Sequence, residues 1–161
     1  MSEQIIAIID INSGEGLGRI KFGMKTDEVE ELLGPADEKE NYTLDSGEST
    51  ESWHYDDLEL SLSFVVSNEK RLVSITTSSE DSILFGEEIV GMNKKELLKY
   101  LEKKKVSDVQ FEDCSSPEAP DLKLYFSMNL AMNFWLEDGI VSDVEWAVKI
   151  DDKDQVIWPI H

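Results

Sequence analysis

The chain has 161 residues, of which 40% are hydrophobic and 31% are charged. This length is that of one ordinary domain, and the apolar content is enough to build a core, so the composition excludes a wholly disordered chain. The net charge is −20 at pH 7, from 35 acidic and 15 basic residues. A surface of this sign repels nucleic acid and anionic membranes, so neither is expected as a partner.

The N-terminal region predicts one short buried strand. Ile5–Ile11 is mostly apolar, and the turn-forming residues of 12–16 follow it directly. The run is too short to span a bilayer, and no basic segment precedes it as in a secretory leader. We therefore expect a cytoplasmic location.

A Gly-Met pair opens each of two short amphipathic segments, 68 residues apart. Gly23-Met24 precedes the first segment and Gly91-Met92 precedes the second, with apolar residues at matching positions after each pair. Thr26 is expected as the N-cap of the first helix, and Gly34-Pro35 is expected to end it. The sequence thus predicts two short helices that share a starting motif.

Strand patterns follow both predicted helices. Five alternating apolar residues predict a strand with one buried face, namely Leu58, Leu60, Leu62, Phe64 and Val66. Adding 68 places them on residues that are also apolar, namely Phe126, Met128, Leu130, Met132 and Phe134. We interpret this as an internal duplication.

The predicted fold is therefore α+β, with two tandem repeats that share a core. Each repeat is a short helical element plus an antiparallel β-sheet. Residues 17–84 form the first repeat and 85–152 the second. Residues 1–16 supply the N-terminal strand and turn, and 153–161 form a C-terminal tail that is expected to add an edge strand.

The acidic residues are concentrated in one stretch. Residues 27–59 hold 13 acidic residues and one basic residue, Lys39. Residues 37–52 lack any apolar period and predict a loop or a frayed hairpin. One interpretation is a solvated face that keeps the protein soluble. The other is a landing surface for a basic partner, whose association charge complementarity would speed by ~10–10³-fold at low salt.

The order of motifs in the first predicted repeat resembles the SmpA/OmlA-like outer-membrane lipoprotein module. The matching motifs are Phe22-Gly-Met-Lys25, Gly34-Pro35, Trp53-x-Tyr55, and the strand patterns of 60–64 and 72–75. The same order resembles one repeat of beta-lactamase inhibitory protein, whose fold is two tandem helix-plus-sheet repeats. The second predicted repeat keeps the Gly-Met pair but lacks the Gly-Pro and Trp-x-Tyr motifs.

This resemblance implies a bacterial, non-enzymatic protein-binding module. Similarity to the inhibitor implies an inhibitor or immunity-type protein that caps a basic partner. Similarity to the lipoproteins implies a structural or assembly module of the cell envelope. This chain is expected to depart from both patterns, because no leader for anchoring is expected from its first residues and a single cysteine cannot form the inhibitor's disulfides.

No catalytic, metal or cofactor site is predicted. Cys114 has flanking acids that raise a thiol pKa, so we expect an inert thiol. His54 lacks a recognisable Ser or Cys nucleophile in the sequence around it, so turnover that depends on His54 would be needed to indicate an enzyme. Asp151-Asp-Lys-Asp154 lacks the glycine and terminal glutamate of an EF-hand and predicts a solvated turn.

The polar face of the predicted sheet is the candidate protein-binding surface. Small polar residues around a large aromatic residue are typical of an interface with a rigid anchor, and Trp135 is that anchor here. The alternative is that Trp135 covers a sheet edge or packs on the tail. The candidate binding residues are Trp53, Tyr55, Asp56, Asp57, Glu59, Ser61, Ser63, Asn129, Asn133 and Trp135.

Overall fold

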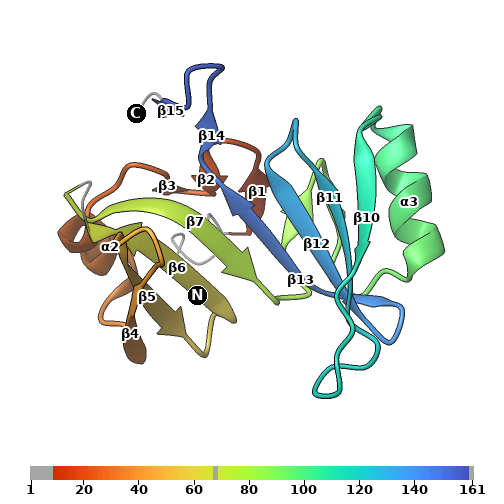
Figure 1. Ribbon diagram of the computed structural model, residues 1–161, viewed down its shortest axis with the longest axis horizontal. Coiled ribbons are helices and arrows are strands. Elements are labelled where there is room, and N and C mark those ends of the chain that lie inside the picture. Colours follow the sequence, from red (N-terminus) through yellow and green to blue (C-terminus); the bar gives the residue numbers. More distant parts are fainter. Residues whose placement is uncertain (1–8, 67–68, 160–161) are drawn as a thin grey trace.

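The computed structural model describes residues 9–66 and 69–159. Its main element is an eight-stranded antiparallel sheet in the order β10-β11-β12-β13-β7-β6-β5-β4 (Figure 1). The long strands β7 and β13 pair with each other at the centre, so segments far apart in the sequence meet there. The strands are β4 (Glu38–Thr43), β5 (Ser49–Tyr55), β6 (Leu60–Val65), β7 (Arg71–Thr77), β10 (Val109–Asp113), β11 (Lys123–Ser127), β12 (Met132–Glu137) and β13 (Ile140–Ala147).

A second, smaller sheet has the order β3-β2-β1-β8-β9. Its strands are β1 (Asp10–Asn12), β2 (Gly16–Leu17), β3 (Ile20–Lys21), β8 (Ile83–Leu84) and β9 (Glu87–Glu88). The parallel pairing of β1 with β8 joins the N-terminal segment to the middle of the chain. Near the C-terminal end, β14 (Lys149–Ile150) and β15 (Val156–Ile157) form a separate hairpin.

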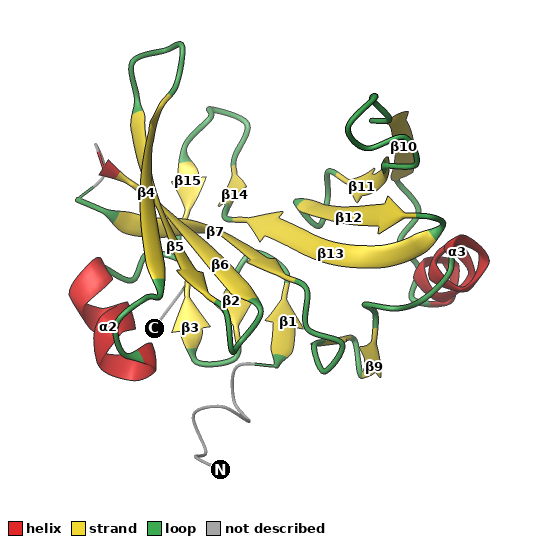
Figure 2. Cartoon of the chain, turned by 90° about the horizontal axis from the view of Figure 1, so that it is seen from below, coloured by secondary structure: helices red, strands yellow, loops and turns green. Residues whose placement is uncertain are grey.

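Two helices, α2 (Thr26–Leu33) and α3 (Lys94–Lys103), lie on the same side of the large sheet as the small sheet (Figure 2). Each begins where its sequence supplies a cap. The Asn93 side chain accepts a hydrogen bond from the Glu96 N–H at 2.8 Å, and Glu96 returns one to the Asn93 N–H at 3.0 Å. At α2, the N–H of Lys25 donates to Glu28 at 2.9 Å.

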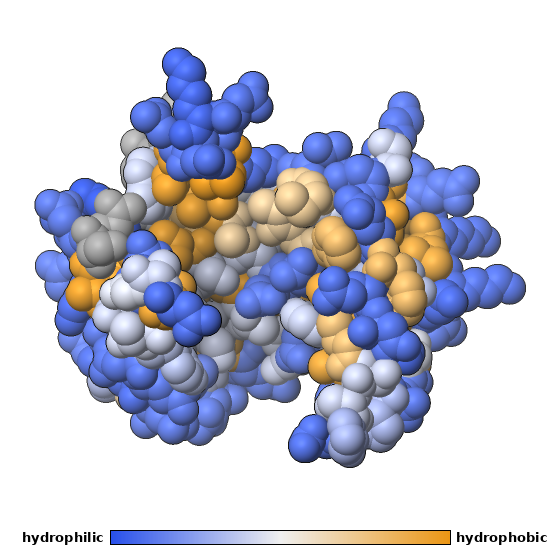
Figure 3. Space-filling view, in the orientation of Figure 1, coloured by the Kyte–Doolittle hydropathy of each residue, from blue (hydrophilic) through white to orange (hydrophobic). Residues whose placement is uncertain are grey.

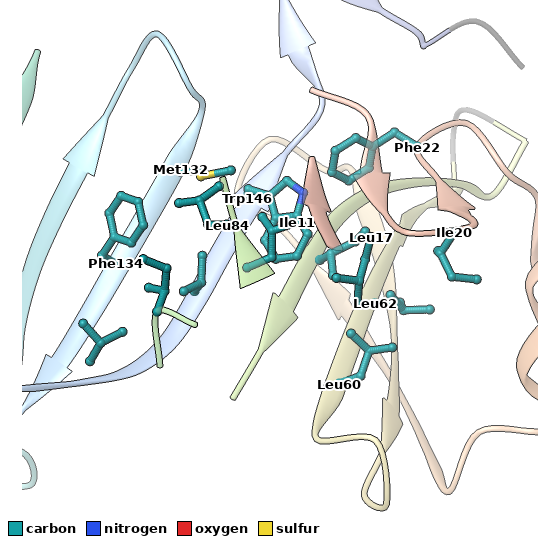
Figure 4. Packing of buried hydrophobic residues seen from close by; sticks show 14 of the residues in the cluster. Ile11, Leu17, Ile20, Phe22, Leu60, Leu62, Leu84, Met132, Phe134 and Trp146 are labelled. Carbon is teal, nitrogen blue, oxygen red and sulfur yellow. The ribbon is translucent and has the colours of Figure 1, made fainter. Parts of the chain in front are cut away.

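The core lies between the large sheet and these covering elements (Figure 4). Leu62, Phe64 and Phe134 from the large sheet are fully buried, as are Val29 and Leu97 from the helices. The other face of the large sheet has no helix over it, and both edges of the sheet rise on that side (Figure 2). We call this the free face.

A tryptophan and a glycine join the two sheets. Trp146 of β13 is 1% exposed, and its indole N–H donates to the Gly16 carbonyl of β2 at 3.2 Å. A Cβ at Gly16 would lie 2.0 Å from the Ile20 carbonyl oxygen, and the Gly16 φ is +144°. Only glycine fits a backbone that approaches this closely, so this turn depends on Gly16.

The predicted α+β fold of two tandem repeats is wrong. The chain is mostly β-sheet, and the structure does not show a two-repeat arrangement. The 68-residue offset fails in the strands, because Met128 and Leu130 lie in the turn between β11 and β12, and Met128 is 70% exposed. Leu58 likewise lies in the turn before β6. An apolar alternation that continues across a tight turn cannot reveal where the chain reverses.

Several smaller expectations have different outcomes. Lys25, and not Thr26, is the N-cap of α2, and Thr26 is its first helical residue. Residues 37–52 form a hairpin, in which β4 pairs with the start of β5. The tail pairs with β14 instead of extending the large sheet. Most of the strand predicted for Ile5–Ile11 lies outside the described residues, and β1 begins at Asp10.

Candidate functional site

One cross-strand row of side chains spans the free face from edge to edge. Residues directly opposite each other on neighbouring antiparallel strands place their side chains on the same face. In the large sheet, one residue of each strand can be traced to its directly opposite partner on the next strand, across all eight strands. The row consists of Glu38, His54, Ser61, Thr76, Glu145, Asn133, Phe126 and Gln110. Its middle is therefore polar, with the small side chains of Ser61 and Thr76 between His54 and Glu145.

A groove of about 490 Å³ lies over one half of this face. Its floor includes the small residues Ser61, Thr76 and Ser78. Five carboxylates line it, from Glu38, Glu40, Asp56, Glu59 and Asp143, and the described residues that line it include His54 but no lysine or arginine. Figure 3 shows the free face, with hydrophilic side chains along its flanks and a hollow between them. The groove is thus acidic and open to solvent, and small side chains form its floor.

His54 is held by two side chains that line the groove, those of Ser61 and Glu40. Its Nδ1 lies 2.8 Å from the Ser61 hydroxyl and its Nε2 lies 3.2 Å from a Glu40 carboxylate oxygen. Tyr42 also donates a hydrogen bond to that carboxylate. The hydrogen bonds from Tyr42 and then His54 lower the pKa of Glu40, because they stabilise its ionised form. Glu40, His54 and Ser61 therefore form a fixed array of hydrogen-bonding groups.

The Ser61–His54–Glu40 order is that of a nucleophile, a base and an orienting carboxylate. Acyl transfer also needs donors for the developing oxyanion, usually backbone N–H groups. Ser61 lies in β6, an interior strand whose backbone groups pair with β5 and β7. Its backbone therefore cannot supply an oxyanion hole of the usual kind. The array is better suited to orienting a bound polar group than to stabilising a tetrahedral intermediate.

A second group of contacts holds Trp135 on the other half of the free face. The Trp135 indole N–H and the Asn133 amide both donate to the same Glu145 oxygen, each at 3.1 Å. Trp135 is half-buried, so part of its ring faces solvent. Nearby, burial raises the pKa of Asp143, which accepts a hydrogen bond from Ser142 at 3.2 Å. Trp135 is thus a positioned aromatic residue beside acidic groups.

The structure places two predicted binding residues in the core instead of on a surface. Trp53 is 2% exposed and Tyr55 is 5% exposed. The Trp53 ring packs on Phe64 at a centroid distance of 4.9 Å, and the Tyr55 hydroxyl donates to the Gly34 carbonyl at 2.9 Å. Alternation along β5 sends these side chains inward and His54 outward. Both side chains are therefore almost fully buried, although Tyr55 also lines the groove on the free face.

The other predicted residues are divided between the groove and its surroundings. Ser61, Ser63, Asn133 and Trp135 point to the free face, and Asp56 and Glu59 line the groove. Asp57 lies in the same turn as Asp56 but does not line this groove, and Asn129 lies in the distant turn after β11. Sequence reasoning did not assign Glu38, Glu40, His54, Thr76, Asp143 and Glu145 to this surface. The alternation of Asp143 and Glu145 with buried Val144 and Trp146 was the available signal.

Two further side-chain groups carry no evident chemistry. Partial burial and the adjacent Glu112 carboxylate raise the pKa of Cys114, which disfavours the reactive thiolate. Within residues 9–66 and 69–159, no group of three or more His, Cys, Asp or Glu side chains is arranged to hold a metal ion. Over the same residues, neither helix is long and apolar enough to cross a membrane.

Comparisons with known proteins define no family for this chain. No family model matches it, and no curated protein matches it. Among solved structures it is similar to an extracellular protein containing a SCP domain from Bacillus anthracis str. Ames, at 14% sequence identity and a TM-score of 0.45. The similarity covers 87% of this chain and 49% of that one, so this chain spans about half the length of that protein.

Proposed function

We propose that the protein is a non-enzymatic binding module whose free face holds a basic segment of a partner protein. The observation that carries this proposal is the groove with five carboxylates and no basic residue among those described in its lining. Of these carboxylates, that of Glu40 lies 3.2 Å from the Nε2 of His54. A lysine or arginine of a partner would supply the missing counter-charge. Charge-assisted hydrogen bonds of this kind are about twice as strong as neutral ones.

The inhibitor or immunity-type version of this role follows from the groove and from the sequence resemblance together. An acidic concave surface would attract a basic partner over long range and then hold it through short-range contacts. The small side chains on the floor of the groove leave room for the backbone of an extended partner segment, and Trp135 provides an aromatic contact beside it. The alternative is a structural or assembly module, for which the acidic groove would be a solvated surface without a bound segment.

The test is an NMR titration with a short arginine-rich peptide at low salt. We expect shifts confined to backbone amides of β4–β7 and β13, and loss of these shifts at high salt. Glu38→Gln combined with Glu40→Gln should weaken binding at least tenfold. Glu87→Gln combined with Glu88→Gln removes the same charge at exposed residues outside the groove and should leave binding nearly unchanged. Shifts distributed equally over all acidic surfaces would refute the proposal and support the solubility interpretation.

The Ser61–His54–Glu40 array supports a second candidate, an acyl hydrolase. An activated aryl ester is the appropriate probe, because it needs little help from an oxyanion hole. Turnover that disappears in both Ser61→Ala and His54→Ala would establish catalysis and overturn the non-enzymatic proposal. Equal background rates in the wild type and both variants would remove this candidate.

A further inference from the structure

The outer surface of α3 carries a row of lysines. Lys95, Lys99 and Lys103 follow one another at intervals of four residues, so they lie along one side of the helix. This side is opposite the buried Leu97 and Leu101, and all three lysines are exposed. Including Lys94, Lys104 and Lys105, the segment 94–105 holds six of the 15 basic residues of a chain with net charge −20.

The N-terminal part of this row is unfavourable within the single molecule, whereas Lys103 in the last turn of α3 suits the helix dipole. Like charges four residues apart on a helix repel each other, and cations in the first turn oppose the helix dipole, as Lys94 and Lys95 do. The salt bridges formed among the described residues include none of the six lysines. None of the six therefore has an ion-pair partner among the described residues, although Lys104 lies over the Tyr100 ring at 5.7 Å.

The complementary surface lies on α2. Asp27 and Glu31 are four residues apart on the side opposite the buried Val29, and Glu30 lies beside them. All three are exposed, and the last turn of α2 contains no basic residue. Glu30 and Glu31 thus lie at the end of the helix where the dipole disfavours anions. The two helices occupy opposite ends of the molecule (Figure 1), on the same side of the large sheet (Figure 2).

We propose that α3 of one molecule docks antiparallel against α2 of a second copy of this chain. Residues four apart on a helix are separated by ~6 Å along its axis, so the spacing of the two charge rows matches. In the antiparallel arrangement, Lys95 meets Glu31 and Lys99 meets Asp27. The N-terminus of α3 then lies beside the C-terminus of α2, and each misplaced charge gains an opposite charge. This proposal is independent of the groove.

The geometry of this contact determines the kind of assembly. The docking faces are different and lie at opposite ends, so the association is head-to-tail and extends into short chains unless it closes into a ring. Two short helices bury less than the ~1,200 Å² of a standard stable interface, so the association is weak and sensitive to salt. A free anionic membrane or nucleic acid fits less well, because it would meet the strongly acidic remainder of the molecule.

The test is sedimentation equilibrium of the full chain over a range of protein concentrations. At about 0.1 M salt the Debye length is ~10 Å, which screens the long-range repulsion but leaves contact pairs. We expect the weight-average mass to rise above the 18.3 kDa of one chain with concentration, and to return to it at 1 M salt, where the Debye length is ~3 Å.

Two charge-reversed variants and their mixture make the test specific. Lys95→Glu with Lys99→Glu, and separately Glu30→Lys with Glu31→Lys, should each weaken association at least tenfold. Lysine and glutamate have similar helix propensities, so both variants should fold, which circular dichroism checks. An equimolar mixture should associate again, because the first variant keeps a native α2 and the second keeps a native α3. Lys21→Glu with Lys153→Glu is the control for the lysine variant, because it makes the same change in net charge away from both helices.

Three results would overturn the proposal. The first is a wild-type protein that remains a monomer up to about 1 mM, the weak end of measurable affinity. The second is association that persists unchanged in both reversed variants. The third is a mixture that associates no more than its components. Capture of the wild type, but not of the lysine variant, by anionic lipid vesicles without self-association would assign the lysine row to a membrane surface instead.

Discussion

Truncation of Trp135 to alanine separates a surface anchor from a core residue. A fully buried Trp→Ala change costs ~3–5 kcal/mol, because both apolar contacts and packing are lost. Trp135 is only partly buried, so a part of that contribution, ~1.5–2.5 kcal/mol, is at stake. Its indole N–H also gives up one hydrogen bond to Glu145, worth ~0.5–1.5 kcal/mol. We therefore expect the free energy of unfolding to fall by ~2–4 kcal/mol.

The assay is thermal and urea unfolding of Trp135→Ala beside two comparison variants. For a domain of this size, a change of this magnitude lowers Tm by roughly 4–16 °C. Trp135→Phe keeps most of the ring and loses only the hydrogen bond, so it should cost ~1 kcal/mol. Trp146→Ala removes a side chain that is 1% exposed and leaves the Gly16 carbonyl without its indole donor, so it should cost the full ~3–5 kcal/mol or prevent folding.

A loss for Trp135→Ala equal to that for Trp146→Ala would refute this reasoning. It would mean that Trp135 is part of the core and that the free face has no aromatic anchor. If Trp135→Ala costs less stability than Trp146→Ala, the Trp135→Ala variant should also weaken partner binding by ~2 kcal/mol or more, mainly through faster dissociation. Reversal of Asp56 to lysine should instead slow association and reduce its salt dependence.

Three further predictions concern stability. Burial raises the pKa of Tyr55 to about 12. The stability that its neutral hydroxyl contributes to the fold is therefore complete below the unfolded pKa of about 10 and is lost as pH rises from about 10 to about 12. Tyr55→Phe should remove that part of the alkaline unfolding curve, and an unchanged curve would contradict the prediction. Gly16→Ala should destabilise the fold by more than ~3 kcal/mol or prevent folding, because the new Cβ would overlap the Ile20 carbonyl. The control is Gly47→Ala, where φ is +91° and the space around the residue is open, and urea unfolding should show a cost of only ~1 kcal/mol. Lys95→Glu should raise the free energy of unfolding by ~0.5 kcal/mol, since it removes a cation from the first turn of α3 and a like-charge pair with Lys99; a decrease would show that the lysine row is stabilised within the single chain.

Local sequence patterns determined the parts of the fold that depend on local geometry. The strand patterns of 60–64 and 72–75 lie within β6 and β7. The two helices predicted after the Gly-Met pairs are present as α2 and α3. They could be predicted because the 3.6-residue period of an amphipathic helix lies within one short segment of sequence. Alternation also placed Ser61, Ser63, Asn133 and Trp135 on the face away from the core, since successive side chains of a strand point to opposite sides.

The tertiary structure alone decided how these elements combine into a surface. The turns at 56–59 and 128–131 interrupt an apolar alternation that reads as continuous, so the sequence could not show the reversals. β4 is polar on both sides and is a strand because β5 pairs with it. The groove needs Glu38 and His54 from one half of the chain and Asp143 from the other. They meet because β7 pairs with β13, a long-range contact whose formation depends on burying both strands over one core and not on any local propensity.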